Sequence, residues 1–310
     1  MEKKIKARNR RIFSVESFKM DYPLYLMLLV PVIIVFIYNY IPMFGILISF
    51  KKYLPAKGFF ASKWVGLKNF EVLFTMPTFT QALINTVVIA LFKIVLNILV
   101  PVVFTLLLNE LSSDKFKKGV QTIVYLPHFI SWVMLASIFM KLLGGSGIVN
   151  QLLMAVGLDP IIFLGDNKWF RFTLIFTDVW KEFGYGTIVY LAAVAGVNVD
   201  LYEAAEMDGA GRWKQTLHVT LPCIAPTIVM MSALSLGNVL NAGFDQVFNM
   251  YNEMVYQSGD ILDTLVYRMA FNNGNFGLST AAGLFKSVIS MIMVAVSYRV
   301  AYVTTGYRAF

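Results

Sequence analysis

Six long apolar segments separated by shorter polar ones constrain the fold of this chain more than any other feature. A helix needs about 20 apolar residues to cross the hydrocarbon core of a bilayer. Inside that core the backbone must satisfy its own hydrogen bonds, so these segments are predicted to be helical. The predicted membrane-spanning helices cover residues 24–50, 83–108, 120–143, 172–195, 223–240 and 281–303. The sequence therefore predicts an all-α membrane protein.

The polar segments indicate one membrane domain, residues 24–303, between a basic tail at residues 1–23 and a short tail at residues 304–310. Seven of the 26 Lys and Arg residues lie in the first 19 positions. Cytoplasmic segments of membrane proteins are enriched in these residues. With both termini inside, the cytoplasmic segments hold thirteen of them and the outer segments eight, five of which are lysines of the first outer connection. We expect both termini to be cytoplasmic and the first span to be retained rather than cleaved as a signal peptide.

The composition excludes several classes of protein. The chain is 58% hydrophobic and only 14% charged, which is too apolar for a soluble domain of ordinary composition. The net charge is +8, but seven of the 26 Lys and Arg residues lie just before the first span, as in a cytoplasmic anchor rather than a nucleic-acid site. One cysteine and two histidines argue against an intrachain disulfide and a metal site. The phosphate-binding motif G-x-x-x-x-G-K-[ST] is absent from the sequence, so no ATP site of that kind is predicted in this chain.

The stretch at residues 200–222 is polar, yet it carries the signals of helices. Asp200 stands three residues before Glu203, the spacing of a capping box, which predicts a short helix at residues 201–207. Gly209 permits a sharp change of direction. Two short helices that meet at a glycine would protrude from the membrane as a stiff unit that suits docking better than catalysis.

The second half of this stretch has an apolar stripe. Asp208 is predicted to cap the second helix. Trp213, Leu217 and Leu221 recur every four residues and therefore share a face, until Pro222 ends the pattern. The alternative is an amphipathic helix on the membrane surface that only connects two spans.

The same stretch resembles the signature loop of the permease subunits of binding-protein-dependent ABC importers. That loop reads E-A-A-x-x-x-G and, further on, L-P. The matching residues and their neighbours, all candidates for docking to an ATPase, are Glu203, Ala204, Ala205, Asp208, Gly209, Ala210, Trp213, Leu217, Leu221 and Pro222. In that family the loop is the coupling helix, which sits in a groove of the cytoplasmic ATPase subunit. The resemblance implies the type I ABC importer permease fold, with six transmembrane helices.

The resemblance extends to permeases of the sugar-uptake branch, especially those for oligosaccharides released from polysaccharides. It includes residues 22–53, 64–70 and 241–252. It implies a multi-pass protein of the bacterial cytoplasmic membrane that contacts lipid and pairs with a second, homologous permease. It also implies two cytoplasmic ATPase subunits that use ATP and Mg, and an extracellular solute-binding protein that delivers carbohydrate. The chain itself is expected to bind no cofactor, metal or nucleic acid and to catalyse no reaction.

Charged side chains inside a span are costly, so they mark candidate functional positions. Aromatic faces beside hydrogen-bonding groups suit a sugar ring. The candidate residues of a substrate path are Trp180, Lys181, Glu182, Phe183 and Tyr185 in the fourth span, and Asn238, Asn241, Phe244, Asp245 and Gln246 at the end of the fifth. Glycines near the second group permit an irregular backbone, which is tolerated at membrane depth where it lines a wet cavity. The alternative for the first group is an interfacial belt of aromatic residues.

Other intramembrane charges are weaker candidates. Lys181 and Glu182 are adjacent and are expected to point in different directions, whereas Asp178 shares a helix face with each of them. Lys93 and Lys286 are expected to snorkel to an interface or to pair with a partner subunit.

Two other classes of function are less consistent with the sequence. A stand-alone secondary transporter or channel subunit would use an ion gradient and an intramembrane carboxylate network, but most Asp and Glu residues lie in predicted loops. His128, which follows a proline, is expected to pack between helices rather than to relay protons. A membrane enzyme would need a nucleophile, a base and an orienting group, and the sequence offers no such grouping.

Overall fold

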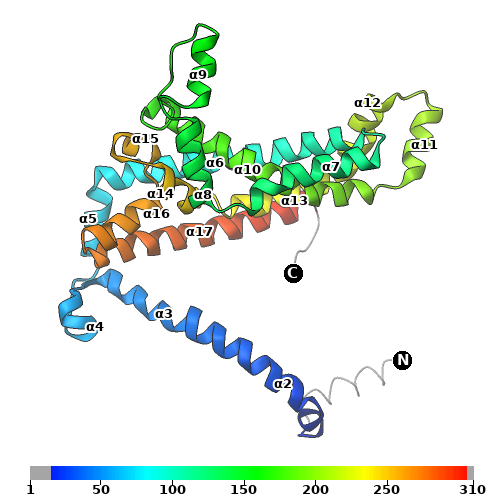
Figure 1. Cartoon of the computed structure of the whole chain (residues 1–310). Coiled ribbons are helices and arrows are strands. Elements are labelled where there is room, and N and C mark those ends of the chain that lie inside the picture. Colours follow the sequence, from blue (N-terminus) through cyan, green and yellow to red (C-terminus); the bar gives the residue numbers. More distant parts are fainter. Residues whose placement is uncertain (1–14, 306–310) are drawn as a thin grey trace.

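The computed structural model describes residues 15–305, in which long helices lie side by side (Figure 1). Four helical segments of this part are long and apolar enough to cross a membrane, namely Tyr22–Phe50, Pro77–Asn109, Arg212–Leu236 and Phe276–Val300. Two bent pairs of helices bring the number to six if each pair forms one span. These pairs are Asp114–Phe129 with Trp132–Leu142, and Asn167–Ala195 with Val199–Met207. The predicted all-α membrane fold is confirmed.

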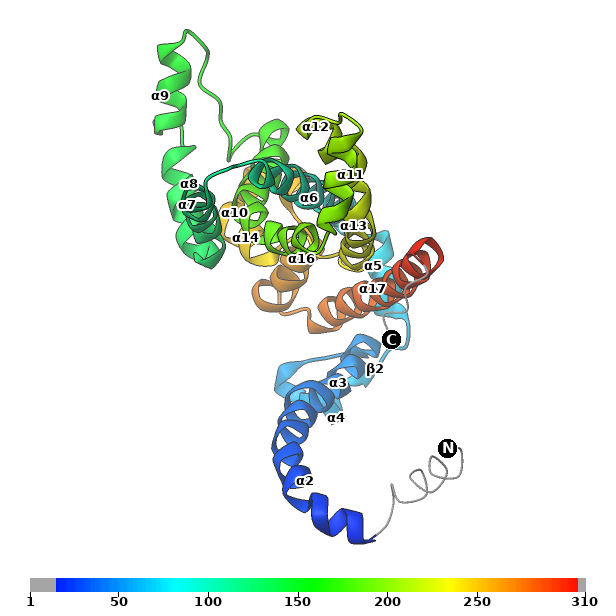
Figure 2. The same ribbon diagram turned by 90° about the vertical axis from the view of Figure 1, so that its right-hand side faces the viewer.

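The first span stands apart from the rest of the chain (Figures 1 and 2). It comprises α2 (Val15–Val35), η1 (Phe36–Tyr40), α3 (Ile41–Met43) and η2 (Phe44–Phe50). Residues 22–44 are exposed throughout, and the span packs mainly through η2, against the last helix, α17 (Phe276–Thr305). Its apolar surface therefore needs lipid or another chain to cover it.

A small hairpin follows the first span, where the sequence predicts a loop with a short helix at residues 51–82. Its strands are antiparallel, and the connection between them contains two short helical turns. The elements are β1 (Lys51–Lys52), η3 (Pro55–Lys57), α4 (Gly58–Ala61), β2 (Lys63–Trp64) and, after the hairpin, α5 (Lys68–Thr75). The long helix α6 (Pro77–Asn109) begins at a proline, before the predicted start at residue 83, because proline is favoured in the first turn of a helix.

The third predicted span, residues 120–143, is not one continuous helix. The chain instead forms α7 (Asp114–Tyr125) and η4 (Leu126–Phe129), and then bends by 101° into α8 (Trp132–Leu142). Pro127 lies in η4, where it lacks the N–H that would continue the helix, and the Ser131 hydroxyl accepts a hydrogen bond from Met134 N at the start of α8. A small helix, α9 (Ile148–Ala155), follows α8.

The core lies around α6 and α10 (Asn167–Ala195), which pack along each other. One buried apolar cluster includes Ile89 from α6 and Phe170 and Leu174 from α10. The helix α10 begins five residues before the predicted start at residue 172, because the Asp166 carboxylate accepts a hydrogen bond from Lys168 N and caps it.

The fifth span begins earlier than predicted. The short helix α12 (Arg212–Gln215) continues through a π turn, η5 (Thr216–Thr220), into α13 (Leu221–Leu236). The expectation that Pro222 ends the helical pattern is wrong: proline at the first turn of α13 follows the wider turn of η5, where the regular hydrogen-bonding pattern is already interrupted.

The connection before the last span is structured. It contains α14 (Phe244–Met250), η6 (Glu253–Val255), α15 (Tyr256–Gly259), α16 (Leu262–Tyr267) and η7 (Arg268–Asn272). Leu262 and Leu265 of α16 are buried against Phe79 of α6 in a second apolar cluster. In Figure 1, α15 and α16 lie toward the hairpin end of the molecule, whereas α11 (Val199–Met207) and α12 lie at the opposite end.

Candidate functional site

The stretch with the importer signature folds as a bent segment, residues 199–215, at one end of the long helices (Figure 1). Gly209 connects its two helices, α11 and α12, with a φ of +76°, which is the left-handed conformation that residues with a Cβ rarely adopt. The turn expected at this glycine is therefore present.

The caps of the bent segment differ from the prediction. Asn198, not Asp200, caps α11, and its side-chain oxygen accepts a hydrogen bond from Asp200 N at 3.1 Å. Asp208 ends α11 instead of starting α12, which begins after Gly211. The capping-box role of Glu203 is also wrong, because this exposed carboxylate makes no hydrogen bond or ion pair with the residues that the structure describes.

The tip of the bent segment presents apolar side chains to solvent. Met207 is 89% exposed and Trp213 is 70% exposed. Of the other predicted docking residues, Ala205, Ala210 and Leu221 are half-buried, and the exposed ones are Glu203, Ala204, Asp208, Gly209, Leu217 and Pro222. Sequence reasoning placed Met207 on the helix but did not include it among the docking residues. Two large exposed apolar side chains on a polar segment are typical of a protein interface.

Hydrogen bonds tie the bent segment to the long helices. Tyr202 OH lies 2.9 Å from Thr220 Oγ1 in η5. Thr216 Oγ1 donates to Glu110 Oε1, at the end of α6, over 2.9 Å, and Gln215 Nε2 donates to the Ala210 carbonyl over 3.0 Å. Tyr202 therefore braces the bent segment against η5, and Thr216 braces η5 against the end of α6.

A second candidate site is a polar cavity of about 260 Å³ between α6, α10 and the irregular backbone that joins α13 to α14. Lys93 of α6 and Asp178 of α10 form an ion pair in its wall, with Nζ 2.9 Å from Oδ1. Asn97 donates to Asp178 Oδ2 over 3.0 Å, and its own Oδ1 is buried without a partner among the described residues. The predicted path residues Asn238 and Asn241 line the same cavity and are exposed in it.

The irregular backbone of this cavity is held by buried hydrogen bonds. Lys93 Nζ donates to the Ala242 carbonyl over 2.7 Å and also to Gln246 Oε1. The buried Gln246 amide in turn donates to the Leu174 carbonyl and to Thr177 Oγ1 on α10. Gly243 has a φ of +91°, and a Cβ there would lie 3.0 Å from Lys93 Nζ. The break predicted near the end of the fifth span thus lies where backbone carbonyls and amides face a polar cavity.

Three other predicted path residues gather at the bend of the third span. Lys181 Nζ donates to the His128 carbonyl and to Glu182 Oε1, both over 2.8 Å. Glu182 Oε2 also lies 2.7 Å from His128 Nδ1, and the His128 ring stacks on Tyr185 with 3.9 Å between centroids. The expectation that Lys181 and Glu182 point apart is wrong, because their flexible side chains converge on His128 although their Cα atoms are adjacent.

The remaining path residues do not line the polar cavity. Trp180 and Phe183 line a separate apolar pocket of about 540 Å³ with Phe92 of α6. Phe244 stacks on another ring of α14, and Asp245 is exposed. The ten predicted path residues therefore lie in several different environments and do not form one site.

The ion pair was missed as a site by sequence reasoning. Lys93 was expected to snorkel or to pair with a partner subunit, and Asp178 was considered only with residues of its own helix. The available signal was the presence of two opposite charges in two apolar spans, each of which needs a partner at membrane depth. Lys286, the other weak candidate, pairs with Asp263 of α16 at 2.5 Å.

Residues 112–303 match the family described as binding-protein-dependent transport system inner membrane component. Two relatives from Bacillus subtilis (strain 168) are Protein LplB, 42% identical over 90% of this chain and 88% of its own, and the polygalacturonan/rhamnogalacturonan transport system permease protein YteP, 41% identical over 96% and 92%. A crystal structure of a bacterial alginate ABC transporter, in complex with alginate pentasaccharide-bound periplasmic protein, contains a chain that is 36% identical. The superposition covers 94% of this chain and 97% of the chain in that structure, with a TM-score of 0.86. The chain therefore belongs to the family of inner membrane components of binding-protein-dependent transport systems, and its fold is that of a type I ABC importer permease subunit.

Proposed function

We propose that the chain is the permease subunit of an ATP-driven importer that carries carbohydrate, in particular oligosaccharides derived from polysaccharides, into the cytoplasm. The observation that carries this proposal is the bent segment, with its left-handed Gly209 and exposed Trp213, on a chain of the importer permease family. The substrate class is supported by the names of the similar proteins, which refer to polygalacturonan, rhamnogalacturonan and alginate.

The bent segment docks on a cytoplasmic ATPase. In this proposal both termini are cytoplasmic, and two ATPase subunits hydrolyse ATP with Mg while the permease binds neither. Met207 and Trp213 enter a groove of the ATPase, and closure of the ATPase pair displaces the segment as a unit because it is braced by Tyr202 and Thr216. The spans then reorient and the cavity opens alternately to the two sides of the membrane.

The polar cavity is part of the sugar path. Asn238 and Asn241 offer amide donors and acceptors to hydroxyl groups. The Lys93–Asp178 pair keeps this wall polar while leaving no net charge. A neutral polar wall suits hydroxyl-rich ligands, and it argues against a stand-alone transporter that needs an unpaired carboxylate to follow an ion gradient.

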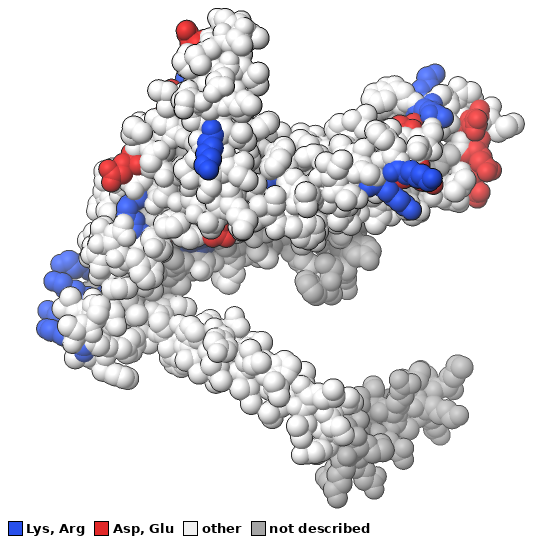
Figure 3. Space-filling model, in the orientation of Figure 1, with Lys and Arg blue, Asp and Glu red and all other residues white. Residues whose placement is uncertain are grey.

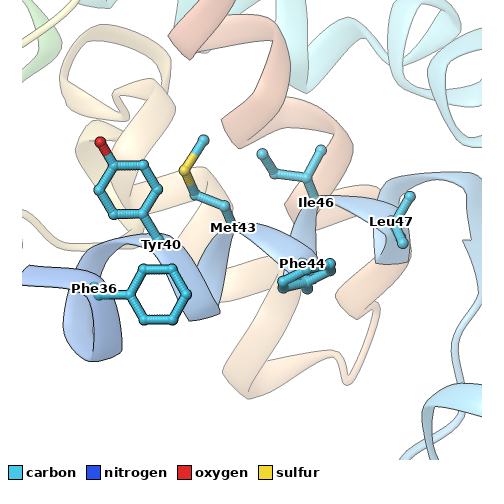
Figure 4. A pocket seen from close by; sticks show the side chains of 6 residues that line it. All are labelled: Phe36, Tyr40, Met43, Phe44, Ile46 and Leu47. Carbon is cyan, nitrogen blue, oxygen red and sulfur yellow. The ribbon is translucent and has the colours of Figure 1, made fainter. Parts of the chain in front are cut away.

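The first span takes part in assembly with a second, homologous permease. Figure 4 shows a pocket of about 560 Å³ on this span, lined by Phe36, Tyr40, Met43, Phe44, Ile46 and Leu47. Because the span stands off from its own bundle, side chains of the second permease can fill this pocket from a neighbouring helix. An extracellular solute-binding protein then delivers sugar to the opposite end from the bent segment.

The test compares two glycine variants of the bent segment in the reconstituted transporter. Gly209→Val forces a β-branched residue into a left-handed conformation, whereas Gly211→Val is a matched control, since Gly211 has a φ of −68° and both sites have open space around them. We expect Gly209→Val to abolish sugar-stimulated ATP hydrolysis or to release the ATPase, and Gly211→Val to retain coupling. Equal coupling in the two variants would contradict the docking role, and uptake that needs an ion gradient but no ATPase would contradict the whole proposal.

A further inference from the structure

The hairpin after the first span carries an unbalanced positive charge. Residues 51–70 contain five lysines and no Asp or Glu. Four of these lysines, Lys52, Lys57, Lys63 and Lys68, are exposed and make no ion pair with any residue that the structure describes. In Figure 3 they gather as a basic patch at the hairpin end of the molecule. Lys and Arg are usually enriched in the cytoplasmic segments of membrane proteins, so lysines on a connection predicted to lie outside need an explanation.

The strand register places two of these lysines opposite each other. Lys52 of β1 and Lys63 of β2 are direct partners in the antiparallel pair. Like charges at such positions destabilise a hairpin, because their side chains emerge on the same face about 5 Å apart. An anion held between the two ammonium groups removes this repulsion. Without an anionic ligand, the repulsion between the two ammonium groups remains.

The hairpin also carries apolar side chains that suit the edge of a bilayer. Phe60, at the turn between the strands, is 94% exposed, and Trp64 of β2 is 56% exposed. The apolar segment Tyr22–Phe50 has 29 residues, so a helix of that length extends about 43 Å, which matches a bilayer including its headgroups. The hairpin begins at Lys51, directly after this segment, at the depth of the headgroups. Aromatic residues are enriched at this depth.

The hairpin is held rigidly in this position. Asn69 Nδ2 donates to the Ser49 carbonyl over 2.7 Å and to the Lys51 carbonyl over 3.0 Å. Ser62 Oγ donates to the Gly58 carbonyl and accepts from Leu54 N, which closes the connection between the strands. The basic and aromatic groups are thus ordered before any ligand binds, which reduces the entropy lost on binding.

We propose that this hairpin is a binding site for an anionic phospholipid. The lipid phosphate lies between Lys52 and Lys63, while Phe60 and Trp64 insert among the headgroups and upper acyl chains. A soluble acidic ligand would satisfy the lysines but would leave Phe60 in water, and the position at the membrane end of the first span favours a lipid. The site does not depend on the transport cycle proposed above.

The experiment measures lipid binding to the purified full-length protein by native mass spectrometry during titration with phosphatidylglycerol or phosphatidylcholine. A single lysine near an anionic surface contributes about 5-fold in affinity, so Lys52→Gln with Lys63→Gln should weaken the tightest phosphatidylglycerol site by about 30-fold. The matched control, Lys115→Gln with Lys118→Gln, removes two exposed charges from α7 and should leave that site unchanged. A photoreactive phosphatidylglycerol should label peptides within residues 51–68.

A second variant separates loss of the site from loss of the fold. Phe60→Ser should weaken phosphatidylglycerol binding while the thermal unfolding temperature stays that of the parent, since Phe60 is almost fully exposed. Equal binding by the parent and the Lys52/Lys63 double variant would overturn the proposal. Equal affinity for phosphatidylcholine would also overturn it, as would full competition by inorganic phosphate or by a soluble acidic oligosaccharide.

Discussion

Replacing Asp178 with asparagine should destabilise the folded chain by about 3–5 kcal/mol, the range for removing one partner of a buried ion pair. The side chains of Lys93 and Asp178 are only 8% and 13% exposed, and their charged atoms are 2.9 Å apart. Asparagine keeps the shape of the side chain but removes its charge. The Lys93 ammonium would then keep only neutral acceptors, among them the Ala242 carbonyl and the Gln246 amide oxygen, and would lose the charge with which it pairs.

The assay is thermal unfolding of the purified protein in detergent, followed by loss of the monodisperse species. A chain of this size changes its unfolding temperature by roughly 2 °C per kcal/mol, so Asp178→Asn should lower it by about 6–10 °C. The control is Asp263→Asn, because the Lys286–Asp263 pair is more exposed, 22% on each side, and its loss should cost less than that of the Lys93–Asp178 pair.

The double variant Lys93→Met with Asp178→Leu tests the coupling directly. Replacing both charges by apolar groups removes the unpaired charge, so most of the lost stability should return. The role of the ion pair in stability would be contradicted if the unfolding temperature of Asp178→Asn lay within 2 °C of that of the parent, a shift no larger than that expected of the control. It would also be contradicted if the double variant lost as much stability as Lys93→Met and Asp178→Leu lose separately, added together.

Two further substitutions test other parts of the structure. Gly259→Ala should destabilise the chain by about 1–3 kcal/mol, because the new Cβ would overlap the Phe170 ring, and Phe170→Leu in the same chain should restore part of the unfolding temperature. Asn241→Ala should raise the KM for sugar-stimulated ATP hydrolysis in the assembled transporter, whereas Asn249→Ala, on α14 away from the cavity, should leave it unchanged.

The long helices were predictable because apolar length alone decides which segments cross a membrane. Their ends were less predictable, since helices continue beyond the apolar core wherever a cap or a first-turn proline allows it. Pro77 starts α6 early and Asp166 starts α10 early. The bend in the third span could have been anticipated from Pro127, since proline lacks the N–H that would continue the regular helix. Hydropathy alone conceals it, because both halves are apolar.

The candidate sites also differ in how far the local sequence predicts them. The turn at Gly209 follows from local sequence, since a left-handed residue between two short helices is a property of neighbouring positions. The pairing of Lys93 with Asp178 requires α6 and α10 to lie side by side, which no local pattern specifies. The convergence of Lys181 and Glu182 on His128 likewise depends on the bend of another span.

Along the chain, the bent segment is connected to the polar cavity by two helices, one from each of its ends. On one side α10 runs from Asp178, in the cavity wall, to Ala195, a distance of about 26 Å, and α11 begins after three intervening residues. On the other side α12, η5 and α13 form one continuous helix to Leu236, and Asn238 follows it into the same cavity. A displacement of the bent segment must therefore reach both walls of the cavity together. The Lys93–Asp178 pair joins one of these helices to α6, and Lys93 also bonds the backbone after α13, so that one ammonium group connects all three. Lys93 is accordingly where we expect movement of the bent segment to be converted into a change in the shape of the cavity.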